Sequence, residues 1–120
     1  MAQNNRRAEA LRTLVLFQSR ALVDDGFDNQ VPGEFETQFT AWANLHPLKG
    51  GEGVISARLE GTQPYIITVR FSSETEQVHE GWQVVEKNNT NRVYSISGPP
   101  TDPDGKRAWL EILSVLGGRS

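Results

Sequence analysis

The stretch of sequence that decides the fold is YIITVRF, residues 65–71. Every second residue is either aromatic or β-branched and apolar, and polar Thr68 and Arg70 stand between them. A repeat of two puts alternate side chains on opposite faces of an extended chain, which is the pattern of a β-strand with one buried face. The residues of the expected inner face are Tyr65, Ile67, Val69 and Phe71.

Strand patterns of this kind recur on both sides of that stretch. Residues 37–45 also alternate, with Phe39, Ala41, Ala43 and Leu45 on one face. The last candidate, residues 108–115, also fits helical spacing, and we assign it to a strand because a sheet with an unpaired edge needs closing. Residues 87–91 suit a hairpin connection because Asn tolerates left-handed backbone angles. The other expected strands are residues 13–20, 54–59, 82–86 and 92–97.

The fold class that follows is mainly β. Eleven Gly and six Pro separate the short apolar runs of 120 residues, which favours many short strands over long helices. We expect a small antiparallel β-barrel or sandwich of six to seven short strands with long loops, in a single domain over residues 1–120. Residues 1–12 form an N-terminal arm, in which the few apolar positions allow at most a short helix.

Composition excludes several classes of protein. A net charge of −3 argues against sequence-independent binding to free duplex DNA, which needs a basic surface. The absence of Cys excludes disulfide scaffolds, thiolate nucleophiles and Cys-bound metal centres. The longest uninterrupted apolar run, residues 14–17, is too short to span a membrane, and the N-terminus lacks a signal-peptide pattern. We therefore expect a soluble protein of a cytoplasm-like compartment, with no membrane partner.

The sequence offers no catalytic, metal-binding or cofactor-binding residues. His46 and His79 fall in different expected loops and lack a second ligand at the spacing of a metal site. The acidic residues 24–36 do not fit a calcium loop, because Gly26 occupies a position that needs an oxygen ligand. Arg70 beside Phe71 and Arg92 near Tyr94 would suit a barrel that binds single strands, but core packing of these aromatics is the stronger interpretation.

Charge is distributed unevenly along the chain. Residues 1–20 hold four Arg and one Glu, whereas residues 21–36, which include the expected loop at residues 23–36, hold five carboxylates and no base. Opposed patches on a small domain suit contacts between copies or with a partner, although a solvated surface of mixed sign is an equal interpretation. The candidate contact residues are Arg6, Arg7, Arg12, Asp24, Asp25, Asp28, Glu34 and Glu36.

The order of short motifs over residues 11–115 resembles the bacteriophage head–tail joining proteins, which include the head-closure or stopper proteins. The first half carries LVLFQ at 14–18, Asp25-Gly26, WANL at 42–45, Pro47-Leu48 and Gly51-Glu52. The second half carries ITVRF at 67–71, VYSI at 93–96 and RAWLEI at 107–112. The chain departs from the family in three places. The family often has a Trp in the strand before the Trp-Ala pair, where this chain has Phe35 or Phe39, and the family's alanine after Gly-Glu falls one or two positions late, on Ala57. The basic N-terminal extension before Leu11 is also outside the family pattern.

The resemblance implies a virion protein of the head–tail connector, assembled in a bacterial cytoplasm. Such proteins form a six- or twelve-fold ring beneath the portal and adaptor, close the DNA-filled capsid and provide a platform for tail-terminator or tail-tube proteins. Packaged double-stranded DNA would lie in the channel without sequence-specific binding. The implied alternatives are a neighbouring adaptor or tail-terminator role, and a monomeric oligonucleotide-binding barrel is the rival from another class. The resemblance implies no enzymatic activity and no cofactor.

Residues 46–62 are the candidate pore-facing loop. Its glycines favour mobility, and its two basic and two acidic residues nearly cancel, so we expect it to narrow a channel mechanically without binding DNA tightly. An ordinary glycine-rich surface hairpin is the plainer interpretation. The candidate pore residues are Lys49, Gly50, Gly51, Glu52, Gly53 and Arg58.

Overall fold

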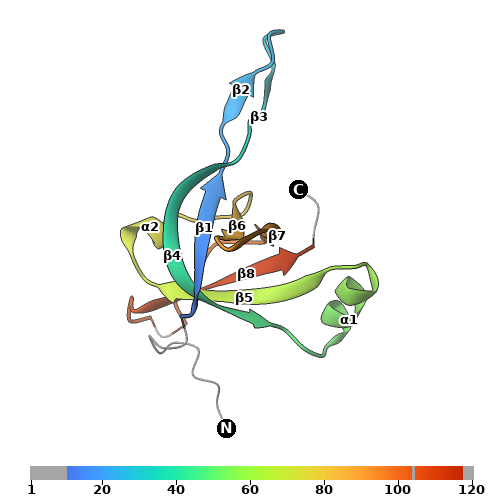
Figure 1. Cartoon of the computed structure of the whole chain (residues 1–120), viewed down its shortest axis with the longest axis vertical. Helices are drawn as coiled ribbons and strands as arrows, with labels where there is room; N and C mark the ends of the chain where they lie inside the picture. The colour runs from blue at the N-terminus through green and yellow to red at the C-terminus, as the bar shows by residue number, and fades with distance from the viewer. Residues whose placement is uncertain (1–10, 104, 118–120) are drawn as a thin grey trace.

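The computed structural model describes residues 11–103 and 105–117, which form eight strands and two short helices (Figure 1). Six of the strands build a barrel, and the other two form a ribbon that projects from one end of it. In chain order the elements are β1 Thr13–Ser19, β2 Leu22–Asp24, β3 Gln30–Pro32, β4 Glu36–Pro47, α1 Glu52–Leu59, β5 Gln63–Arg70, α2 Ser73–Glu76, β6 Gln83–Glu86, β7 Asn89–Ile96 and β8 Trp109–Leu116.

The barrel is closed and antiparallel, with the strand order β1-β4-β5-β8-β7-β6 and a final pairing of β6 with β1. β1 lies between its partners in a defined register, with Val15 opposite both Ala41 of β4 and Glu86 of β6. β5 and β8 pair along their whole length, from Gln63 opposite Leu116 to Arg70 opposite Trp109. The mainly β, antiparallel fold expected from the sequence is therefore confirmed, and of the two expected forms, barrel and sandwich, it is the barrel.

The core lies inside the barrel and consists of the inward-facing side chains of its strands. Phe17 stacks on Phe39 at 4.7 Å between ring centroids, and Phe39 meets Trp82 at 6.2 Å. These rings fill the end of the barrel nearest the ribbon base, where Val78 also packs into the cluster. Trp82 and Tyr94 are buried, and Tyr65 and Phe71 pack against the core, as the preferred interpretation of these aromatics predicts.

Most of the expected strands are present at the expected places. The pattern of residues 65–71 gives β5, and the ambiguous residues 108–115 give β8, in which Leu110, Ile112 and Ser114 are buried. In β4, the alternation of residues 37–45 places Phe39 and Ala43 inside and leaves Trp42 on the outer face. Period-two patterning was a sound guide wherever one face of a strand meets the core.

Four expectations were wrong in detail. Residues 54–59 are not a strand but most of α1, which begins at Glu52. The expected loop at residues 23–36 contains the β2–β3 ribbon. His46 lies in β4 rather than in a loop, and β7 begins at Asn89, so the hairpin connection is shorter than expected. The expected helix of the N-terminal arm falls almost wholly outside the described residues.

Two phenylalanines make a matched test of this core. Replacing fully buried Phe17 with Ala should lower the free energy of unfolding by about 3–5 kcal/mol, because it leaves a cavity against Phe39. Replacing Phe27, which is 80% exposed at the ribbon tip, should change it by no more than about 0.5 kcal/mol. Urea unfolding followed by tryptophan fluorescence measures both, and equal losses would contradict the assignment of the core.

Candidate functional site

The β2–β3 ribbon joins β1 to β4 and stands clear of the barrel (Figure 1). Its strands pair from Leu22 opposite Pro32 to Asp24 opposite Gln30. The base is closed by a hydrogen bond of 2.8 Å from the Gly33 N–H to the Ala21 carbonyl, and the Arg20 guanidinium lies 4.6 Å from the centroid of the Phe35 ring. These contacts attach the ribbon to the barrel.

The tip of the ribbon is a tight turn held by carboxylates. Asp25 Oδ1 accepts hydrogen bonds from the backbone N–H of Phe27 at 2.8 Å and of Asn29 at 3.4 Å, and Asp24 Oδ1 accepts one from the Gly26 N–H at 2.8 Å. The N–H of Phe27 stabilises the ionised carboxylate and so lowers the pKa of Asp25 below its ordinary value of 3.8. The turn carries the ring of Phe27 out into solvent.

A second projection joins β4 to β5 and contains α1 (Figure 1). Gly50 and Gly51 have φ angles of +79° and +83°, which L side chains adopt only with strain, so these glycines make the turn that leads into the helix. The first helical hydrogen bond runs from the Ile55 N–H to the Gly51 carbonyl at 3.0 Å. The glycines therefore set the shape of this connection.

The helix α1 offers an apolar face to solvent. Ile55 and Leu59 are one helical turn apart, on the same side of the helix, and both are exposed, Leu59 to 83%. The helix packs against β5 and no other element to a comparable extent in the described chain. An apolar face of this kind on a thin connection is a candidate contact surface.

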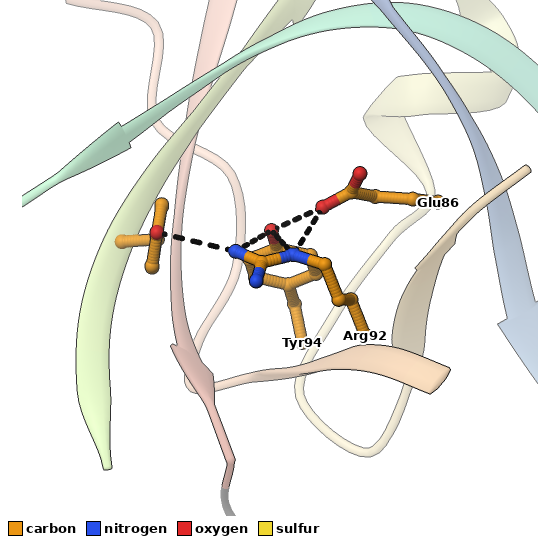
Figure 2. Close-up of polar contacts among 4 residues, drawn as sticks. Glu86, Arg92 and Tyr94 are labelled. Atoms are coloured by element: carbon orange, nitrogen blue, oxygen red, sulfur yellow. Dashed lines mark hydrogen bonds and ion pairs between the residues drawn. The ribbon is translucent and has the colours of Figure 1, made fainter. Parts of the chain in front are cut away.

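A polar cluster ties the β6–β7 hairpin to the inside of the barrel (Figure 2). Glu86 Oε2 accepts a hydrogen bond of 2.6 Å from the hydroxyl of buried Tyr94 and an ion-paired one of 2.7 Å from Nε of Arg92. Nη2 of Arg92 donates to the hydroxyls of Tyr94 at 3.2 Å and Tyr65 at 3.4 Å. A register shift between Val85 and Glu86 occurs where the carboxylate joins the cluster.

The cluster is a structural lock. Burial and the hydrogen bond to Glu86 both favour the neutral phenol and raise the pKa of Tyr94 above its ordinary value of 10.0, with the first effect the larger. The two tyrosine rings meet edge to face at 5.1 Å. Because each of these polar groups has a partner, removing one of them would leave another without its hydrogen bond and would cost stability.

The structure separates the candidate pore residues from the candidate contact residues. Lys49 to Gly51 lie in the turn before α1, and Glu52, Gly53 and Arg58 belong to the helix itself. The acidic candidates gather on the ribbon and its connection to β4, whereas Arg12 precedes β1 at the other end of that strand. Arg6 and Arg7 lie outside the described residues.

Several kinds of chemistry have no support in the described residues. Trp82 and Tyr94 are buried, so neither can offer a ring face to a nucleic-acid base. Among the residues the structure describes, no three or more His, Asp or Glu are grouped to hold a metal ion. No described helix is long and apolar enough to cross a membrane. Exposed His79 accepts a hydrogen bond at Nε2 from the Trp82 indole, and its Nδ1 lies 2.6 Å from the Glu80 carbonyl oxygen.

The described residues form a closed barrel with two projecting connections, and among them no cluster of metal-binding side chains occurs. The family model for phage head completion proteins matches residues 6–117. The chain belongs to the phage head completion protein family. This is a family of structural virion proteins, and the membership confirms the resemblance identified from the short motifs.

Two solved structures share the fold of this head completion protein. The solution structure of protein SF1141 from Shigella flexneri 2a matches with a TM-score of 0.66 and 23% identity, over 95% of this chain and 99% of that one. A chain from the virion of a native gene transfer agent particle matches with a TM-score of 0.62 and 17% identity, over 88% and 93%. No curated protein matches.

Two features of this head completion protein were missed from the sequence. The ribbon was missed although Asp25-Gly26 is a hairpin signal, because the apolar alternation beside it lasts only three residues on each side. The Glu86 cluster was missed because it depends on Tyr65, which is distant in sequence and reaches the hairpin only when the barrel closes. Neither Glu86 nor Phe27 belongs to a motif that would have drawn attention to it.

The cluster of Glu86, Arg92 and Tyr94 predicts how the free energy of unfolding changes with pH. The Tyr94→Phe variant should lose about 1–2 kcal/mol of unfolding free energy near pH 8, because Glu86 loses its shortest hydrogen bond. Since the folded-state pKa of Tyr94 is raised, its contribution is fully present below pH 10.0 and declines as the pH rises above that value. Urea unfolding of both proteins from pH 8 to 11 should therefore show the difference shrinking, and a constant difference would contradict the role of the hydroxyl proton.

Proposed function

We propose that this chain is a head–tail connector protein that forms a ring beneath the portal and adaptor, closes the DNA-filled capsid and provides the docking platform for the tail. The observation that carries the proposal is the family match over residues 6–117. The likeness in fold to a chain of a gene transfer agent virion adds support, since it is a protein of an assembled particle. Either a phage or a gene transfer particle fits this role.

The proposed partners are other copies of the chain in a six- or twelve-fold ring, adaptor or portal proteins on the head side, and tail-terminator or tail-tube proteins on the other side. Double-stranded DNA passes through the channel without sequence-specific contacts. The net charge of −3 and the acidic ribbon support a channel protein that does not hold DNA tightly. Assembly takes place in the bacterial cytoplasm, and the finished location is the neck of the virion.

The β4–β5 connection, residues 46–62, is the segment we propose to narrow the channel. Lys49 and Arg58 offset Glu52 and Glu60 in charge, so a ring of these connections carries bands of both signs with little net attraction for DNA. The projection of α1 from the barrel supports this assignment, because a constriction needs a segment that reaches beyond the ring wall (Figure 1). In this proposal DNA is retained mechanically.

Two other functions remain as outcomes of the test. An adaptor or tail-terminator protein would act in the same neck, but adaptors are usually helix-rich, and this chain has eight described strands against two short helices. A monomeric oligonucleotide-binding barrel would need exposed aromatic faces, and burial of Trp82 and Tyr94 weighs against it.

The proposal is tested with DNA-filled, tailless heads. The chain should bind to them, as measured by light scattering, and reduce the release of DNA to external nuclease. A chain that ignores the heads but retains single-stranded oligonucleotides at moderate salt would overturn the proposal. A chain that binds heads without slowing DNA loss would support the adaptor role in place of closure.

The same assay tests the channel segment. Deleting residues 49–53 removes the turn that leads into α1 and should give heads that bind the chain but lose their DNA. The control variant Lys49→Ser/Arg58→Ser keeps the length of the connection and should retain DNA, because the constriction is mechanical. Heads that stay full with the deletion would contradict this role, and leakage with the control would indicate an electrostatic one.

The acidic ribbon is proposed to contact a ring neighbour, the adaptor or the tail. Asp24 and Asp25 hold the turn, so reversing them would damage the tip as well as remove charge. The variant Asp28→Asn/Glu34→Gln spares those turn contacts and should weaken head binding most at low salt, where charge attraction is least screened. The matched control Glu76→Gln/Glu80→Gln removes two exposed charges elsewhere. Equal salt curves for the two variants would show that the ribbon charges are merely solvated.

A further inference from the structure

The ribbon tip presents an aromatic side chain that the fold leaves uncovered. Phe27 is 80% exposed, and Leu22 and Val23 below it are exposed as well. A solitary two-stranded ribbon is marginal in water, yet this tip is fixed by the three backbone hydrogen bonds to Asp24 and Asp25. A pre-organised aromatic knob loses little conformational entropy when it binds, which is the property of an anchor residue.

The barrel carries a cavity of a size suited to an aromatic ring. A cavity of about 230 Å³ opens where β4 and β5 separate and α2 begins, with Phe39, Ala41 and Trp42 of β4 and Leu11 before β1 among its lining residues. A cavity of about 150 Å³ is enough to hold benzene, so this one admits a phenyl ring. Trp42 is an exposed large apolar side chain at its rim and would be covered by an occupant.

The charges of the two surfaces are complementary. The tip carries Asp24, Asp25 and Asp28 within five residues, and no base occurs between residues 21 and 36. The cavity is lined by Arg70, whose guanidinium is held 5.2 Å from the centroid of the Trp109 ring, and Arg12 follows Leu11. Glu74 also lines the cavity and offsets the charge of Arg70, so the positive balance around the cavity comes from Arg12, beside the lining residue Leu11. That balance favours an acidic tip over a basic one.

The tip cannot fill the cavity of its own chain. The cavity lies on the barrel, whereas the ribbon points away from the barrel and carries its tip at the far end (Figure 1). We propose that Phe27 of one copy inserts into the Leu11–Trp42–Arg70 cavity of the next. Such a contact joins different surfaces of identical chains and closes into a ring when the rotation between copies allows it. The inference rests on the ring of the proposed function and names its contact.

The contact is tested by photo-crosslinking from the tip. A benzoyl-substituted phenylalanine at position 27 keeps the aromatic ring, and mixing isotope-labelled with unlabelled chains separates crosslinks between copies from those within one. On DNA-filled heads, the crosslinked peptides should come from a second copy and contain residues 11, 40–42 or 70–75. The matched control carries the same group at Leu59, which is 83% exposed on α1, and should give no crosslink to that cavity.

Other outcomes overturn the contact. Crosslinks to an adaptor or tail protein, to the larger groove beside the ribbon base lined by Leu22, Pro32 and Trp82, or to no second copy would each do so. If those heads still hold their DNA, the proposed closure function stands without this contact. If the chain does not bind heads at all, the proposed function fails, and crosslinks between copies in concentrated free chain then decide the contact alone.

Substitution of the anchor gives a second readout. Phe27→Ala should weaken association between copies by at least about tenfold, whereas Phe27→Leu, which keeps an apolar knob, should retain most of it. Association is measured by sedimentation at a common chain concentration, or by occupancy of heads. Because Phe27 is outside the core, both variants should unfold at the same urea concentration as the parent chain. Equal association of the alanine variant and the parent would overturn the role of Phe27.

Discussion

Each barrel strand hydrogen-bonds to two neighbours, and the circle of strands closes where β1 pairs with both β4 and β6. This closure places Phe17 and Phe39 against each other inside the barrel and gives every barrel strand two hydrogen-bonded neighbours, with β7 and β8 meeting over the three pairs from Tyr94–Leu116 to Ile96–Ser114. It also brings Tyr65 of β5 within reach of the β6–β7 hairpin, where Arg92 contacts it. Core, lock and projections all depend on this one closed set of backbone hydrogen bonds.

A closed barrel has few free edges with which to recruit partners by strand addition. The connections between the strands are then the candidate contact surfaces, and two that follow one another in the chain project from the barrel (Figure 1). The connection from β1 to β4 becomes a ribbon with a fixed acidic tip, and the connection from β4 to β5 becomes a helix with two exposed apolar residues. Both emerge from β4, so the longest strand of the barrel, Glu36–Pro47, carries both candidate surfaces.

The sequence predicted the strands correctly where one buried face makes apolar side chains recur at every second residue. It predicted the exposed connections poorly, because no such alternation is required there. The strands β1, β4 and β5 were recognised because their inward faces meet a common core, whereas β8 was assigned because the sheet needed a closing strand. Residues 54–59 were assigned to a strand because Ile55, Ala57 and Leu59 also satisfy a period of two, whereas local glycine turns and helical hydrogen bonds favour α1. The candidate contact residues were found by charge, but Phe27 among them was overlooked because exposure cannot be read from a single aromatic in an acidic segment.

The sequence by itself determined the β character of the chain, its aromatic core and the separation of basic and acidic segments, because alternation and composition are local properties. The tertiary structure alone decided the strand order, the Glu86–Arg92–Tyr94 lock, the direction of the ribbon and the cavity between β4, β5 and α2. Each of these joins residues far apart in the chain. Such contacts exist only after backbone pairing has brought the strands together, so no local pattern encodes them.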